Sequence, residues 1–238
     1  MIPAFVANDT GSNGVTTTFT ATIPAGAAIG DILYTAIAYR NNVTWSTNNT
    51  LGAWVQVHGS ATGNSNTTPA SGRGSLYSFY HVYNGVSPNL TFTASANANV
   101  WRQTTLTIRG INPTGGTNTL GNTSILSQTV ATVTPNTATI TIGANAFLVM
   151  CVAGGADDTC SGYTAGTQPT SGSWTERHDA LSTSGGDTML AVATATGNTL
   201  GGATGTLQAT CTNSSFHCIG VAEFKPYIRS RQRYNCGS

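Results

Sequence analysis

The chain has very little charge. Only 7% of its 238 residues are Asp, Glu, Lys or Arg, whereas an average soluble domain has roughly 25%. Nine basic residues are too few for a general nucleic-acid binder, because phosphate affinity depends on many Lys and Arg contacts. Apolar runs long enough for a membrane helix are missing, and the first residues do not resemble a secretory signal. We therefore expect no nucleic-acid partner and no membrane partner.

Long helix-forming side chains are also scarce. The chain has one Lys and two Glu, and it is rich in Thr, Ser, Asn and Gly, with 28 Gly. Thr is β-branched and packs well on a pleated surface. Hydrophobic residues still make up 39% of the chain, which separates it from disordered polar segments. This composition predicts an almost entirely β protein.

Short strands follow one another along the whole chain. Residues 15–23 alternate between apolar residues and Thr, which is the period of a half-buried strand. Residues 31–38 and 146–153 are apolar on both faces, so we expect central strands that are covered on both sides. Further strands are predicted at 53–58, 75–82, 90–95, 102–108, 137–142, 174–178, 188–195, 205–210 and 218–224. Turn-rich segments separate them, so the pattern predicts an all-β, antiparallel β-sandwich or jelly-roll-like fold.

The order of these features repeats in the second half of the chain. Leu33 in the first buried strand corresponds to Leu148 in the second, 115 positions later. The other matched pairs are Trp54 with Trp174, Leu76 with Leu190, Trp101 with Phe216, and Leu106 with Val221. We predict a duplication.

This repeat divides the chain into two related halves, at about 15–113 and 123–226. Each half could fold as its own sandwich, or both could supply strands to one sandwich over 15–226. The lack of a flexible linker favours one compact two-layer unit. Residues 1–14 are predicted to form an N-terminal arm, and residues 227–238 a basic C-terminal arm.

Five segments, taken in order, resemble a diffuse group of bacteriophage virion proteins. The first is Ile-Pro-Ala-Gly-Ala-Ala-Ile-Gly-Asp-Ile-Leu at 23–33, followed by Ala53-Trp54, where the group has Gly-Trp. Next come Tyr-His-Val-Tyr-Asn-Gly at 80–85 and Thr-Ile-Arg-Gly-Ile at 107–111, and the second half closes on Glu-Phe-Lys-Pro at 223–226. The resemblance implies a β-sandwich component of a virus particle, on the head surface or the tail.

The five cysteines lie at positions 151, 160, 211, 218 and 236, so at least one has no intramolecular partner. Cys211 and Cys218 flank a short turn and could cross-link adjacent strands, although assembly in a reducing cytosol disfavours a disulfide. Cys151 lies in an apolar strand and is interpreted as a small buried side chain. Cys236, in the tail, could be exposed and reactive.

Two groups of acidic residues could carry chemistry. Glu176, His178 and Asp179 could suggest the acid and base of a glycosidase. The strand period would place Glu176 and His178 on one face and Asp179 on the other, and a polar surface strand explains the pattern equally well. Asp157 and Asp158 could bind calcium, but no further carboxylate flanks them, which favours a solvated loop. We expect no catalytic residues, no metal site and no cofactor.

Aromatic residues and the basic tail are the candidate contact sites. The possible interface aromatics are Trp45, Trp54, Trp101 and Trp174, which could otherwise fill a core or stack on sugar rings. Four of the nine basic residues lie beyond Glu223, and no acidic residue follows them. This segment is either a frayed tail or an arm that binds an acidic neighbouring surface. The partner-binding residues of such an arm are Tyr227, Arg229, Arg231, Arg233 and Tyr234.

These features predict a non-catalytic structural component of a bacteriophage particle. Because the chain has few long charged side chains, little rotamer entropy is lost when large surfaces are buried. The first choice is a capsid decoration (cement) protein, located in the virion, that assembles as a homo-oligomer in the host cytoplasm and contacts the major capsid protein or other virion proteins. The alternative is a tail-fibre or adhesin module that binds host glycans, and a depolymerase enzyme comes third.

Overall fold

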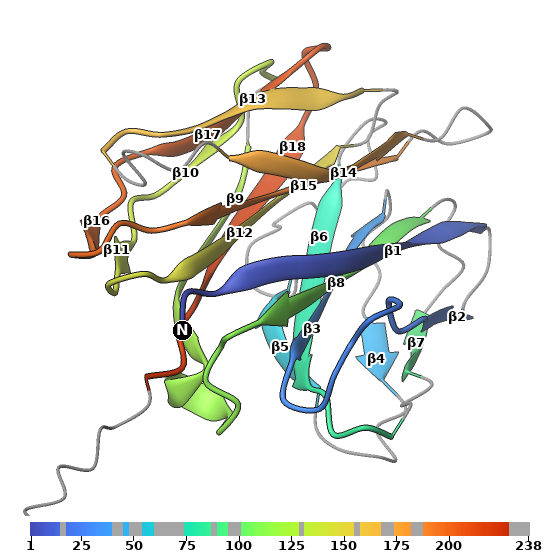
Figure 1. Ribbon diagram of the computed structural model, residues 1–238. Coiled ribbons are helices and arrows are strands. Elements are labelled where there is room, and N and C mark those ends of the chain that lie inside the picture. Colours follow the sequence, from blue (N-terminus) through green and yellow to red (C-terminus); the bar gives the residue numbers. More distant parts are fainter. Residues whose placement is uncertain are drawn as a thin grey trace, which may run out of the picture.

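The chain folds as two β-sandwiches, one from each half of the sequence (Figure 1). The structure is a computed structural model. It describes residues 1–14, 18–39, 45–47, 54–59, 74–86, 90–94, 101–128, 131–154, 158–167, 174–181 and 188–228.

The first sandwich has a five-stranded and a three-stranded antiparallel sheet. The large sheet has the order β1 (Ala4–Gly14), β8 (Trp101–Arg109), β3 (Ile32–Tyr39), β6 (Ser75–Val82) and β5 (Val55–His58). The small sheet has the order β2 (Thr18–Ala21), β7 (Leu90–Ala94) and β4 (Trp45–Thr47).

The second sandwich repeats this plan. Its large sheet has the order β9 (Leu120–Ser127), β18 (His217–Phe224), β12 (Phe147–Gly154), β15 (Met189–Thr196) and β14 (Thr175–Leu181). Its small sheet has the order β10 (Asn136–Thr137), β17 (Leu207–Cys211) and β13 (Cys160–Ala165). The short pair β11 (Thr141–Ile142) and β16 (Gly202–Ala203) extends the small-sheet layer, and a 3₁₀ turn, η1 (Gly116–Asn118), links the halves.

The two large sheets face each other, which makes the molecule four layers thick (Figure 1). One apolar core lies between the large sheets, and a further core lies inside each sandwich. β3 and β12 are buried along their whole length because a small sheet covers one face and the opposite large sheet covers the other. The predicted antiparallel all-β sandwich fold is confirmed, and the strands form four layers where the sequence favoured two.

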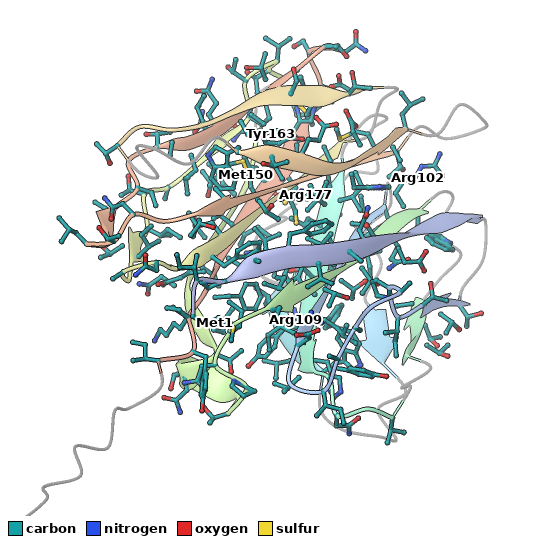
Figure 2. All side chains as sticks on the ribbon, viewed as in Figure 1. Met1, Arg102, Arg109, Met150, Tyr163 and Arg177 are labelled. Carbon is teal, nitrogen blue, oxygen red and sulfur yellow. A yellow bond between two sulfur atoms is a disulfide. The ribbon has the colours of Figure 1, made fainter. Side chains whose placement is uncertain are left out.

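Aromatic and basic side chains join the two sandwiches. In the central core Phe224 of β18 packs edge-on against Tyr34 and Tyr80, with ring centroids 5.7 and 5.9 Å apart. At one rim of the interface Arg177 lies beside β1 (Figure 2), with its guanidinium carbon 4.0 Å from the centre of the Phe5 ring. The side-chain amide of Asn8 donates to the Arg177 carbonyl oxygen over 2.8 Å. The halves are therefore packed as one body.

The strand pairings define the repeat residue by residue. Leu33 and Leu148 occupy matching positions, and each points into the core of its own sandwich. Leu106 pairs with Tyr34 on β3, and the residue that pairs with the matching Val149 on β12 is Ala222. The predicted match of Leu106 with Val221 is therefore displaced by one residue. This slip reverses the face, because Leu106 lies in the central core and Val221 in the core of the second sandwich.

Several strands lie where the sequence predicted arms or turns. Residues 4–14, predicted as part of an arm, form β1. β13 and the start of β9 lie in segments 154–173 and 112–122, which were predicted as turns. β1 and β9 are the outer strands that pair with β8 and β18. Both are rich in Gly, Asn and Ser, so their strand conformation depends on pairing with a neighbour rather than on local propensity. The run predicted as one strand at 137–142 divides into β10 and β11.

Candidate functional site

The predicted interface aromatics are mostly enclosed within the sandwiches. Trp54 and Trp101 are 8% and 5% exposed and belong to the core of the first sandwich, where Trp54 stacks on His81. Trp174 is half-buried against the core of the second sandwich. Trp45 lies on β4, and its side chain is outside the described part of the chain. The three described indoles therefore act as core residues rather than as surface anchors.

The base of the predicted C-terminal arm lies beside the N-terminus. The main-chain N–H of Tyr227 donates to the Gly110 carbonyl oxygen over 2.8 Å, and the Met1 amino group contacts the Tyr227 carbonyl oxygen at 3.4 Å. Arg229, Arg231, Arg233 and Tyr234 lie outside the described residues, as does Cys236.

Large apolar side chains are exposed around this point, which we call the terminal patch: Met1, Ile2, Tyr227 and Ile228. Met1, Ile2 and Ile228 are 72%, 70% and 80% exposed, and Figure 2 places Met1 at the edge of the molecule where the C-terminal segment leaves. A hollow of about 620 Å³ adjoins the patch and is also lined by Ala144, Asn145 and Pro226. The patch thus offers an apolar surface at the start of the basic segment.

The second sandwich holds a buried disulfide between Cys160 and Cys211. The two residues lie directly opposite each other on β13 and β17. The link between Cys211 and Cys218, which the sequence left open, is not formed, because the chain crosses from the small sheet to the large sheet between them. Cys218 instead lies in the central core, together with Cys151. Burial raises the pKa of Cys151 to about 12 and that of Cys218 to about 11, so both thiols stay protonated at neutral pH.

Asp158 is a buried structural carboxylate rather than a solvated loop residue. Its Oδ1 accepts hydrogen bonds from the Thr212 hydroxyl at 2.6 Å and from the main-chain N–H groups of Thr159 and Asn213 at 2.9 Å. Its Oδ2 lies 2.9 Å from Nε2 of His217, and both side chains are fully buried. Asp157 lies outside the described residues, so the predicted calcium pair reduces to this one carboxylate.

Ser215, His217 and Asp158 are neighbours, but their arrangement differs from a Ser-His-Asp triad. The Ser215 hydroxyl lies 3.3 Å from Nε2 of His217, the same nitrogen that contacts Asp158. A triad needs the serine and the carboxylate on opposite ring nitrogens. Nδ1 of His217 is buried and has no hydrogen-bond partner within the described residues. One ring nitrogen of His217 also lies within 4.8 Å of both sulfurs of the disulfide.

The predicted orientation of Glu176, His178 and Asp179 is wrong. A β-bulge at Arg177 breaks the alternation of β14, so Glu176 lies opposite Ala193, His178 opposite Val192 and Asp179 opposite Ala191. Val192 faces the central core, whereas Ala191 faces the core of the second sandwich. Glu176 and Asp179 therefore share a face, and His178 points to the other.

Asp179 is the acidic group with the most altered environment on that face. Burial and the nearby charge of Glu176 raise the pKa of Asp179 to about 7. Its Oδ2 accepts the main-chain N–H of Cys160 at 3.1 Å, so the carboxyl group helps to hold the disulfide strand.

Comparison with family models, with curated proteins and with solved structures finds no match to this chain. Among the described residues, no helix is long and apolar enough to cross a membrane.

Proposed function

We propose that the chain is a non-catalytic structural component of a bacteriophage particle, and that it acts as a capsid decoration protein bridging shell subunits. The observation that carries this proposal is the terminal patch at the base of the basic C-terminal segment. Three of its side chains are at least 70% exposed, and Lys225, Arg229, Arg231 and Arg233 lie within a few residues of it in the sequence. Exposed apolar side chains that are followed in the sequence by several cationic residues suit attachment to an apolar site on an acidic protein surface.

The body of the molecule suits a structural role in a particle. A single apolar core joins both large sheets, so the two sandwiches form one rigid block rather than two domains on a flexible linker. The low charge of the chain reduces the side-chain entropy that is lost when a broad surface is covered.

A second function, as a host-binding adhesin, is favoured by two matched loops. Val86 follows β6 and Leu200 follows β15, and the two side chains are 53% and 89% exposed. In each loop an Asn side chain two residues earlier accepts the main-chain N–H of the exposed residue, over 3.0 Å from Asn84 and 3.1 Å from Asn198. The repeat thus preserves an apolar loop tip, which is a surface available for a receptor.

Copy number separates these functions. An antibody against the purified chain identifies the protein in purified particles, and quantitative gel densitometry gives its copy number. A decoration protein should be present in hundreds of copies per particle. An adhesin would be present in few copies and would bind host cells or glycans as a free protein. Absence of the protein from purified particles would contradict both assignments.

Two variants test the attachment surface. One combines Ile2→Ser with Ile228→Ser, and the other combines Arg229→Ser, Arg231→Ser and Arg233→Ser. Both variants should remain folded, because all these residues are exposed or lie beyond the last strand, and both should be incorporated less into particles. Val133→Ser is the control, since it removes an exposed apolar side chain next to the Thr132–Ser215 bridge, at the opposite end of β18 from the patch. Equal incorporation of all three variants would contradict attachment through the terminal patch.

A further inference from the structure

We propose that Cys160, Cys211 and His217 form a binding site for a zinc ion when the disulfide is reduced. The two sulfurs and a ring nitrogen of His217 already lie within 4.8 Å of one another, and all three residues are buried. Two thiolates and one imidazole are a donor set that zinc prefers, and a fourth position can be taken by water. The second sandwich would then have two cross-links that exclude each other, a disulfide and a metal clamp.

The hydrogen bonds of His217 suit a metal ligand. A carboxylate only accepts hydrogen bonds, so Nε2 of His217 carries the proton that it shares with Asp158. This leaves the lone pair of Nδ1 free, and Nδ1 is the buried ring nitrogen without a partner among the described residues. Histidine ligands of zinc commonly donate their other N–H to a carboxylate, which fixes the tautomer and orients the ring. Asp158 is itself held by three donors, so it can position the imidazole.

The change from the disulfide to the zinc-binding form needs a two-electron reductant. A trialkylphosphine and one water convert the disulfide into two thiols, and the phosphine leaves as its oxide. The sulfur–sulfur bond accepts two electrons, and the two thiol protons come from the water. Zinc then displaces both thiol protons to the solvent and binds the two thiolates.

The first sandwich cannot form this site. The positions that match Cys160 and Cys211 are Trp45 and Ala94, which lie opposite each other on β4 and β7. Neither residue offers a metal ligand. A single ion per chain is therefore expected, and it should bind in the second sandwich.

The test uses the full chain with Cys236→Ser, which removes the thiol of the tail. After phosphine treatment without oxygen, Co²⁺ replaces zinc as a spectroscopic probe, and competition with Zn²⁺ gives the zinc affinity. We expect thiolate-to-cobalt charge-transfer absorption, intense visible bands of a tetrahedral site, and loss of both when one equivalent of Zn²⁺ is added. The oxidised protein should show none of these signals.

Three variants localise the site. His217→Gln keeps an N–H for Asp158 but removes Nδ1, and it should weaken zinc binding at least ~100-fold. Asp158→Asn should weaken binding about 10–100-fold, because it alters only the group that orients the ligand. Cys218→Ala is the matched control, since it removes a buried thiol from the central core and should leave zinc binding unchanged.

The proposal is overturned if the reduced chain keeps its β circular dichroism but gives no thiolate–cobalt absorption. It is also overturned if His217→Gln binds zinc as tightly as the parent chain. If reduction unfolds the chain, refolding with and without one equivalent of Zn²⁺ decides the matter, because a true site restores the fold and zinc without effect contradicts it.

Discussion

The two sandwiches follow one strand plan but are filled with different side chains. The core of the first is aromatic, with Trp54, Trp101 and Phe79, and Tyr77 stacks on Tyr39 at 5.5 Å between ring centroids. The core of the second is built from smaller aliphatic and sulfur-containing side chains: Met150, Val152, Ala191, Leu207, Cys160 and Cys211. The same topology is therefore compatible with two different ways of holding a small sheet onto a large one.

The difference is sharpest where the small sheets can be compared position by position. Trp45 opposite Ala94 in the first sandwich matches Cys160 opposite Cys211 in the second. Only the second pair is linked covalently. Large aromatic residues stabilise a core through the apolar area that they bury, whereas a cross-link acts mainly on the unfolded chain. The second sandwich should therefore depend on its cross-link.

The largest expected effect comes from removing that cross-link. Cys160→Ala with Cys211→Ala should lower the free energy of unfolding by about 2–5 kcal/mol, because the bond closes a loop between residues 51 positions apart. Urea unfolding followed by tryptophan fluorescence checks this value, since Trp54 and Trp101 report on the first sandwich and Trp174 on the second.

The same experiment shows whether the sandwiches unfold together. The central core predicts one transition for all four indoles, shifted to lower urea in the variant. A shift confined to Trp174 would show instead that the second sandwich unfolds by itself. Trp174→Phe in the variant background leaves only the indoles of the first sandwich, and the difference from the parent variant gives the signal of Trp174.

The next largest effect is expected at Gly74, where the main chains of the two halves lie close together. A Cβ at this position would lie 2.5 Å from the main chain of Ala153 and Gly154 on β12. The matching position in the second half is Thr188, where the repeat accommodates a fully buried side chain. Gly74→Thr should therefore separate the large sheets and cost about 3 kcal/mol, measured by urea unfolding. Thr188→Ser is the control and should cost less than half as much.

Two matching histidines give the third effect, a loss of stability in acid. Burial lowers the pKa of His58 to about 4, and burial together with the charge of Arg102 lowers that of His178 to about 4. The unfolded chain takes up these protons near pH 6.5, so the stability that each neutral histidine contributes is lost as pH falls from about 6.5 to about 4. At about pH 5 each residue should cost about 2 kcal/mol relative to neutral pH.

Substitution separates the two histidines. His58→Gln and His178→Gln should each flatten the acid limb of the urea-unfolding free energy plotted against pH. At neutral pH His58→Gln should cost more, because His58 bonds the Ser78 hydroxyl at 2.8 Å and the Val221 carbonyl oxygen at 3.0 Å. Nε2 of His178 is buried without a hydrogen bond in the described structure. An acid limb that is unchanged in both variants would assign the loss of stability to other groups.

The sequence could predict the buried strands of this fold but not their pairing into layers. Runs that are apolar on both faces predicted β3 and β12, because a strand covered on both sides has no polar face. Nothing in such a run shows whether the second cover is a small sheet or another half of the chain. The edge strands β1 and β9 were missed because their Gly- and Asn-rich sequences depend on pairing with β8 and β18.

The chemistry of the second sandwich was hidden from sequence for a related reason. Asp158, Cys160, Cys211 and His217 are up to 59 positions apart and meet only because β13 pairs with β17 and the chain then crosses to β18. The spacing of the cysteines carries no signal for this pairing. The strand period predicted the wrong partner for Glu176, because one bulged residue at Arg177 reverses the faces that follow it.

The smallest of the four predicted effects is at Asp179, which the bulge places on the same face as Glu176. Its pKa is about 7, raised first by burial and then by Glu176, so the folded chain holds a proton that the unfolded chain releases near pH 4. The stability linked to this proton is present below about pH 4 and is lost as pH rises towards 7, opposite in sign to the effect of the histidines. The matching positions of the first sandwich are Gly59 and Gln56, and neither residue has an ionisable side chain.

Asp179→Asn keeps the size of the side chain and an acceptor for the Cys160 N–H while removing the ionisation. It should raise the free energy of unfolding at about pH 8 by about 1 kcal/mol, a value reduced for the partial solvent exposure of the group, and should change little at about pH 4. Glu176→Gln should give a smaller gain in the same direction, because it removes only the neighbouring charge. Urea unfolding at both pH values measures each change. An Asp179→Asn gain that is as large at pH 4 as at pH 8 would show that packing, and not the carboxyl proton, distinguishes this edge of the second sandwich from the first.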